Sequence, residues 1–165
     1  YKRSRNSYDE KVMSNPLFKG VQVITADVPP SKPFTQPGTQ DLVVTFRNLH
    51  NWLGQDAMKA IMQEAYNSLK DGGHFGVVEH RAPEGSDLEF MKKSGYVTQS
   101  LAIQTAEEVG FKLVASSEIN ANPKDTADHP KGVWTLPPSF RLKDQDRAKY
   151  AAIGESDRMT LLFKK

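Results

Sequence analysis

The stretch "DLVVTFRNLHNW", Asp41 to Trp52, begins with the pattern of a buried strand and ends in polar and aromatic residues. Its β-branched run suits a strand in a sheet that is covered on both faces. Arg47, Asn48 and His50 follow where this strand ends. In an open α/β sheet, side chains at the carboxyl ends of the strands line the ligand crevice. The stretch therefore predicts a functional site directly after this strand.

The segments around this strand alternate between strand and helix patterns. From Met58 to Leu69 the apolar residues recur at helical spacing, and "KDGG" (residues 70–73) ends that helix. We expect a helix at "SLAIQTAEEVGF" (100–111) and a short one closing at "SYDEKVMSNPLF" (7–18). Strands are expected at "GVQVITADV" (20–28), "HFGVVEHR" (74–81), "KLVASSEI" (112–119) and "DRMTLLFKK" (157–165). This order predicts an α/β fold with a doubly wound, mostly parallel sheet.

Polar residues follow two further strands in the same way. Glu79, His80 and Arg81 end the strand at 74–81, and Asp27 ends the strand at 20–28. We expect the three strand ends to face one crevice. Residues 120–147 form the only long irregular stretch, and Trp134 lies at its centre in "GVWTLPPSF". Because such long loops are usually functional, we expect Trp134 to form a lid or wall over a pocket.

Composition narrows the possible partners. The 165 residues fit one domain, and 22 Lys and Arg against 20 Asp and Glu leave a small net charge of +2. Lys2, Arg3 and Arg5 form the only compact basic group, so we expect no nucleic acid. No apolar stretch approaches the ~20 residues that span a bilayer, so we expect no membrane. The absence of Cys excludes disulfides and thiolate metal sites and leaves the compartment open.

Several motifs resemble a known superfamily. "QDLVVTFRNLHNW" and "LKDGGHFGVVEH" resemble the C-terminal portion of class I S-adenosylmethionine-dependent methyltransferases. "EHRAPEG", "SGYV", "INANPKDT", "GVWTLPP" and "IGESDRMTL" resemble a bacterial group of predicted methyltransferases of unassigned substrate. The resemblance runs from about Val21 to Phe163.

The resemblance implies a sheet of strand order 3-2-1-4-5-7-6 with an antiparallel C-terminal strand. In that order residues 21–26 resemble strand three and residues 42–46 resemble strand four. The superfamily's Gly-rich cofactor loop and the acidic residue after strand two have no counterpart in this sequence. We therefore expect residues 1–165 to form a single methyltransferase-like domain that is truncated at its N-terminus and lacks the first two strands.

The resemblance also implies roles for individual residues. S-adenosylmethionine would be the cofactor, with Asp27 accepting from the adenine amino group and Val28 packing on the ring. The methionine portion and the sulfonium would lie near Phe46, Arg47 and Asn48. His50 or His80 could serve as general base, with Glu79 orienting an imidazole or acting alone. The residues expected on the side of a small-molecule acceptor are Trp52, Arg81, Tyr96 and Trp134.

Simpler interpretations stay open at several positions. Trp52 suits core packing, and Asp27 before a Pro-rich segment suits the capping of a turn. Arg47 and Arg81 could pair with Glu79 or Glu84, and His129 is expected to be solvated. We expect no metal, because no local His-x-x-His or Asp-rich ligand spacing occurs.

Other functional classes fit less well. A Ser-His-Asp hydrolase would need a Gly-x-Ser-x-Gly elbow, which is absent. A dinucleotide dehydrogenase shares the architecture and also needs a Gly-rich loop, so only the resemblance separates it from a methyltransferase. The alternative function is a non-catalytic α/β module that serves in binding or association. An incomplete sheet also favours a homo-oligomer.

Overall fold

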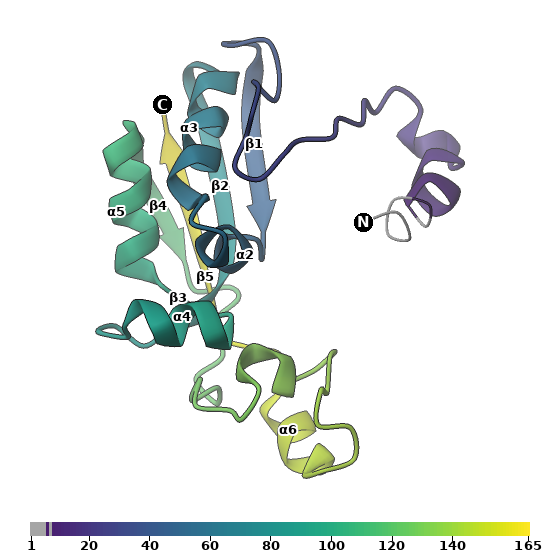
Figure 1. Cartoon of the computed structure of the whole chain (residues 1–165), viewed down its shortest axis with the longest axis vertical. Coiled ribbons are helices and arrows are strands. Elements are labelled where there is room, and N and C mark those ends of the chain that lie inside the picture. Colours follow the sequence, from purple (N-terminus) through teal and green to yellow (C-terminus); the bar gives the residue numbers. More distant parts are fainter. Residues whose placement is uncertain (1–5, 7) are drawn as a thin grey trace.

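A five-stranded sheet forms the centre of the protein. The computed structural model describes Asn6 and residues 8–165 (Figure 1), so Lys2, Arg3 and Arg5 lie outside the described residues. The strands are β1 (Gln40–Phe46), β2 (Leu69–Ala82), β3 (Val97–Thr98), β4 (Lys112–Ser117) and β5 (Arg158–Lys164). Their order is β1-β2-β5-β4, with the short β3 paired to β2. β1 runs parallel to β2, whereas β5 runs antiparallel to β2 and β4. The expected α/β class and antiparallel C-terminal strand are confirmed.

In the described part of the chain, five labelled α-helices accompany the sheet: α2 (Leu49–Gly54), α3 (Met58–Ser68), α4 (Leu88–Ser94), α5 (Gln99–Val109) and α6 (Arg147–Ile153). The expected helices correspond to α3 and α5. At the start of α5 the side chain of Thr98 accepts from the Leu101 amide, and Gly110 ends the helix in a left-handed conformation. The sequence analysis missed α2, α4 and α6. Each has seven residues or fewer, which is too short to show helical periodicity.

The hydrophobic core lies between the sheet and α3 and α5 (Figure 1). Phe75 on β2 and Phe163 on β5 are buried, and Phe111, which follows α5, stacks on Phe75 with 5.1 Å between ring centroids. Burial of each such side chain contributes about 1.5–3 kcal/mol. Alternate residues of β1 face away from this core. Leu42, Val44 and Phe46 are 56%, 50% and 59% exposed, so the second face of the sheet is apolar and open at β1.

The predicted strand at residues 20–28 is wrong. Residues 21–27 have no regular secondary structure, and Val21 and Ile24 are exposed. In Figure 1 the chain runs here as an irregular segment from the N-terminal turns, which lie apart from the sheet, towards β1. A strand needs the backbone hydrogen bonds of a neighbour. Within the described residues, β1 pairs only with β2, and no strand lies beside residues 20–28.

The expected N-terminal helix ends just before the predicted stop. Asp9–Met13 form one π-helical turn, and Pro16–Phe18 form a 3-10 turn. The side chain of Asn15 accepts from the Leu17 amide at 3.0 Å, so the predicted stop at Asn15-Pro16 is confirmed.

The irregular stretch 120–147 is an ordered excursion from the sheet. It contains a 3-10 helix, η3 (Gly132–Thr135), and leads into α6, which lies below the strand ends in Figure 1. Asn122 ties its beginning to its end, because its Nδ2 donates to the carbonyls of Ile153 (2.9 Å) and Glu155 (2.6 Å). We call residues 118–157 the excursion.

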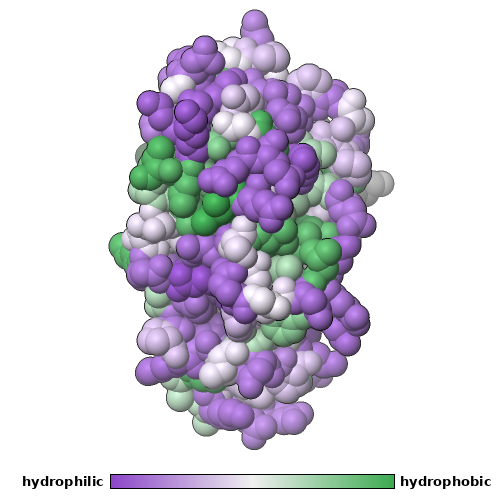
Figure 2. All heavy atoms as spheres, turned by 90° about the vertical axis from the view of Figure 1, so that its left-hand side faces the viewer, coloured by the Kyte–Doolittle hydropathy of each residue, from purple (hydrophilic) through white to green (hydrophobic). Residues whose placement is uncertain are grey.

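The remaining surface is mostly hydrophilic. Figure 2 shows the side of the molecule with α5 and β4, where apolar groups gather at mid-height between polar areas. All six residues of the edge strand β4 are exposed, Val114 by 50%. Among the described residues, no helix is long and apolar enough to cross a membrane.

Candidate active site

A buried carboxylate–imidazole pair lies at the carboxyl ends of β1 and β2. Glu79 is fully buried, and its Oε1 lies 3.0 Å from His50 Nδ1. The backbone amides of His80 (2.8 Å) and His50 (3.2 Å) also donate to this carboxylate. Three donors thus satisfy the Glu79 side chain. Because His50 uses Nδ1 for this contact, its Nε2 remains to accept or donate a proton.

His80 lies next to this pair. Its Nδ1 is 2.5 Å from Ser156 Oγ, and its ring centroid is 5.5 Å from that of His50. Burial, followed by the positive charges of His50, Arg47 and Arg158, lowers the pKa of His80 from 6.5 to about 3. His80 is therefore neutral at ordinary pH and a weak base.

The two imidazoles line a pocket of about 340 Å³. Its remaining walls come from the end of β1, from the excursion and from the start of β5. The lining residues there are Phe46, Arg47, Asn48, Val133, Trp134, Pro137, Pro138, Ser139, Glu155, Ser156 and Arg158. We call this the strand-end pocket. Arg47, in the turn from β1 to α2, has a left-handed conformation (φ 57°) that few non-glycine residues adopt. Its amide donates to the Val78 carbonyl at 2.7 Å, which fixes this turn against β2.

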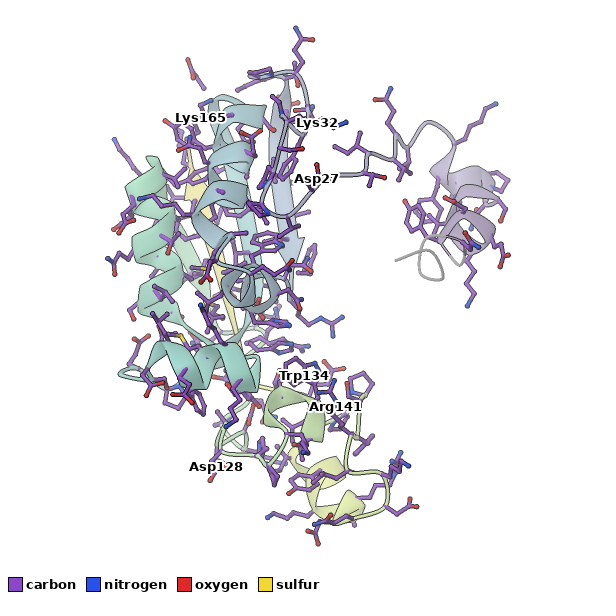
Figure 3. The ribbon with its side chains drawn as sticks, viewed as in Figure 1. Asp27, Lys32, Asp128, Trp134, Arg141 and Lys165 are labelled. Carbon is purple, nitrogen blue, oxygen red and sulfur yellow. The ribbon has the colours of Figure 1, made fainter. Side chains whose placement is uncertain are left out.

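Trp134 forms part of the pocket wall that the excursion contributes, and its position is fixed by packing on both sides. A Cβ at Gly95 would lie 2.9 Å from Cη2 of Trp134, and a Cβ at Gly132 would collide with the Ser94 carbonyl. Both glycines have positive φ and allow η3 to dock closely against the end of α4. On the other side, the Arg141 guanidinium lies 4.6 Å from the Trp134 ring centroid, and Figure 3 shows the two residues side by side. The indole also contacts His50 edge-on at 5.9 Å.

The structure brings together six of the predicted site residues besides Glu79. Phe46, Arg47, Asn48, His50, His80 and Trp134 all line the strand-end pocket. Two others lie elsewhere. Asp27 and Val28 follow no strand, and Figure 3 shows Asp27 far from Trp134. The Asp27 carboxylate accepts from Ser31 Oγ, so it caps the local turn.

Three predicted substrate-side residues also lie outside the strand-end pocket. Trp52 packs against the core. Tyr96 is fully buried and donates to both carboxylate oxygens of Asp125, at 2.9 and 3.1 Å. Burial and Asp125 raise the pKa of Tyr96.

Arg81 lines a second hollow and forms ion pairs with Asp157 (2.8 Å) and Glu118 (2.7 Å). These carboxylates, Glu118 first, raise the pKa of Arg81. The alternative partners Glu79 and Glu84 are therefore not the ones that Arg81 contacts.

The donor atoms of His50, Glu79 and His80 could surround a metal ion. One ligand atom from each lies within 4.8 Å of the others, and these are the only such trio among the described residues. However, Glu79 is already satisfied by three donors, and Arg47 and Arg158 bring positive charge to the same pocket. The arrangement fits proton transfer better than cation binding.

On the β5 side of this pocket, sequence reasoning missed all three lining residues, Glu155, Ser156 and Arg158. They lie at the start of β5, where the antiparallel register places Arg158 opposite His80. The polar run "GESDR" before the last strand was the available signal. Its use required the pairing of β5 with β2, which local patterns do not specify.

Comparison with known proteins gives the fold its class. No family model and no curated protein sequence matches the chain. Among solved structures, it resembles the [4+2]-cyclase SpnF, with a TM-score of 0.59, 17% identity, and coverage of 98% of this chain and 60% of SpnF. It also resembles a protein from Galdieria sulphuraria assigned as a sarcosine dimethylglycine methyltransferase, with a TM-score of 0.57 and 15% identity. That match covers 99% of this chain and 64% of the Galdieria protein. A protein from Listeria monocytogenes assigned as an S-adenosylmethionine-dependent methyltransferase has a TM-score of 0.56 and 15% identity. That match covers 100% of this chain and 76% of the Listeria protein.

The protein is therefore an α/β protein with a pocket at the carboxyl ends of its strands. More particularly, it has the fold of the class I S-adenosylmethionine-dependent methyltransferases. The chain spans about 60% of the length of SpnF and 64% of that of the Galdieria protein.

Proposed function

We propose that this protein transfers a methyl group from S-adenosylmethionine to a small-molecule acceptor bound in the strand-end pocket. The observation that carries the proposal is that His50, held by the buried Glu79, lines a pocket at the strand ends of a methyltransferase fold. Structures similar to this chain include the methyltransferase CalH and the protein PigF, each determined with S-adenosylhomocysteine. The match to this chain covers 39% of CalH and 40% of PigF.

The residues at the end of β1 suit the methionine end of the cofactor. Phe46 is 59% exposed and offers an apolar surface, while Arg47 offers a cation. The Asn48 amide donates to Thr45 Oγ1 at 3.3 Å, which leaves its own oxygen for the ligand. When bound, S-adenosylmethionine supplies a methyl group on a positively charged sulfur, and the acceptor's lone pair bonds to that carbon as the carbon–sulfur bond breaks.

The protein contributes mainly alignment and proton transfer. Trp134 and the prolines at 137–138 close one side of the pocket and exclude water. If the acceptor is a hydroxyl, its proton passes to Nε2 of His50, and Glu79 stabilises the imidazolium through Nδ1–H. We assign this role to His50 and not to His80, because the lowered pKa makes His80 a weak base. His80 then acts as a neutral hydrogen-bonding group of the pocket.

One observation favours a second candidate function. Leu42, Val44 and Phe46 form an exposed apolar row on β1, and this strand pairs on one side only within the described residues. Such an edge suits strand pairing with another chain. A non-catalytic association module would bind its partner through this edge, and the His50–Glu79 pair would then have no catalytic role. SpnF, a cyclase, shows that this fold also serves other reactions.

Calorimetric titration with S-adenosylmethionine and S-adenosylhomocysteine tests the proposal. We expect saturable binding of both to this chain, and formation of S-adenosylhomocysteine when acceptors are added. His50→Gln should bind the cofactor normally and lose turnover. Absence of cofactor binding, together with concentration-dependent association in sedimentation, would favour the association module.

A further inference from the structure

Arg158 has an unusual position in the strand-end pocket. Its side chain is 20% exposed, and its Nη1 pairs with Glu155, whose side chain is half exposed. Its Nε is buried and has no hydrogen-bond partner; Glu64 Oε2 is the only other such side-chain atom among the described residues. Buried donors are nearly always paired in native proteins. Because Arg158 also lines the strand-end pocket, its incompletely paired guanidinium is a candidate group for binding a ligand oxygen.

The charge of the pocket favours an anion. The lining contains two arginines, Arg47 and Arg158, and one carboxylate, Glu155. Cross-strand pairing places Arg158 directly opposite His80, so its charge lies on the same part of the sheet as the imidazoles. A guanidinium binds a planar carboxylate through two parallel hydrogen bonds, which gives orientation as well as affinity.

The other walls indicate the body of the ligand. Trp134, Phe46 and the prolines at 137–138 offer flat apolar surfaces, which suit an aromatic ring. His50, held by Glu79, would accept a proton, and this is useful only if the methylated atom carries one. A ring hydroxyl meets that requirement, and the pocket volume of about 340 Å³ suits a small molecule.

We propose that the acceptor is an aromatic hydroxy acid whose carboxylate binds Arg158 and whose hydroxyl faces His50. This inference rests on the proposed methyl transfer. In the reaction the hydroxyl oxygen forms a bond to the methyl carbon, the carbon–sulfur bond breaks, and the hydroxyl proton moves to His50. The products are a methyl ether and S-adenosylhomocysteine.

Binding of a matched pair of probes tests the inference without any turnover. The protein carries labelled histidine, and the ring signals of His50 and His80 are followed by NMR during titration with 4-hydroxybenzoate and with 4-hydroxybenzamide. We expect the acid to bind about tenfold more tightly than the neutral amide, as a charged hydrogen-bonded pair implies. Arg158→Gln should abolish this preference. Glu155→Gln should strengthen acid binding, because it removes the competing carboxylate.

Lys164→Gln is the matched control. It removes one positive charge from the other end of β5, where Lys164 pairs with His74 of β2. This variant should keep the preference for the acid. Equal affinity for the two probes, no binding of either at millimolar concentration, or a preference that survives in Arg158→Gln would overturn the inference.

A parallel titration with S-adenosylhomocysteine separates the two proposals. Arg158→Gln should bind it as the wild type does. A selective loss of this binding would assign Arg158 to the cofactor carboxylate and overturn the inference. If the wild type fails to bind S-adenosylhomocysteine but prefers the acid probe, methyl transfer fails while the pocket for aromatic acids stands.

Discussion

Two buried carboxylate–imidazole pairs in this protein have nearly the same geometry and different surroundings. In the strand-end pocket, His50 lies 3.0 Å from Glu79, and in the excursion, His129 lies 2.7 Å from Asp125. Both carboxylates are fully buried, and the imidazoles are 9% and 5% exposed. Each imidazole also meets an aromatic ring edge-on, Trp134 at 5.9 Å for His50 and Tyr150 at 5.8 Å for His129.

The difference lies in what else the carboxylate binds and where the imidazole leads. Asp125 also accepts from the Tyr96 hydroxyl and from the amides of Ala127 and Asp157, so it joins three separate segments of the chain. Glu79 accepts only from His80, the next residue, and from His50 on α2, and His50 opens onto the strand-end pocket. A carboxylate–imidazole pair is therefore no sign of catalysis by itself; access to a pocket distinguishes the two.

The largest expected effect is on stability, at the excursion pair. Asp125→Ala removes the common acceptor of four donors and should lower the free energy of unfolding by about 3–5 kcal/mol. Urea denaturation followed by circular dichroism measures this. A loss below about 1 kcal/mol would show that Asp125 does not tie the excursion to the sheet.

The second effect is on turnover, at the pocket pair. His50→Ala should lower the rate of S-adenosylhomocysteine formation with an aromatic hydroxy acid about 100-fold, because it removes the proton acceptor. His129→Ala is the matched control and should lower stability while the rate per folded molecule stays close to wild type. Equal rates in the two variants would remove the functional distinction between the pairs.

The third effect is a dependence of stability on pH that comes from His80. Its pKa in the folded protein is lowered from 6.5 to about 3, so between these values the unfolded chain takes up a proton that the folded protein does not. Stability should therefore fall as the pH decreases from 6.5 towards 3, by up to about 1.4 kcal/mol per pH unit. Thermal melts of wild type and His80→Gln should show a shallower acid loss in the variant. Parallel curves would assign the acid sensitivity to other groups.

The smallest effect concerns the two aromatic neighbours. Trp134→Leu should raise the KM for the acceptor about two- to tenfold, as expected for loss of an aromatic wall. Tyr150→Leu should instead lower the melting temperature and leave KM unchanged, because Tyr150 is buried within the excursion and does not line the strand-end pocket. Steady-state kinetics and thermal melts of both variants give the comparison. A changed KM in Tyr150→Leu would show that packing inside the excursion affects acceptor binding in the strand-end pocket.

Much of the fold was predictable, but not all of it. The runs at 42–46 and 74–81 and the helices α3 and α5 follow from apolar periodicity and from Gly110 as a helix stop. The strand at 20–28 was wrong, because apolar character alone does not supply a hydrogen-bonding neighbour. His129 was expected in solvent and is buried, because its partner Asp125 is positioned by contacts with Tyr96 and Asp157.

The sequence by itself determined the α/β class and the polar strand ends around Arg47, His50, Glu79 and His80. These features depend on local patterns, since side-chain periodicity and residue type are set by neighbours along the chain. Only the tertiary structure decided that Glu79 meets His50, that Asp125 meets His129, and that Arg158 lies opposite His80. His50 and Glu79, like His80 and Arg158, are far apart in sequence and meet only in the folded sheet. Asp125 and His129 are four residues apart, but their burial depends on the path of the excursion, which no local pattern encodes.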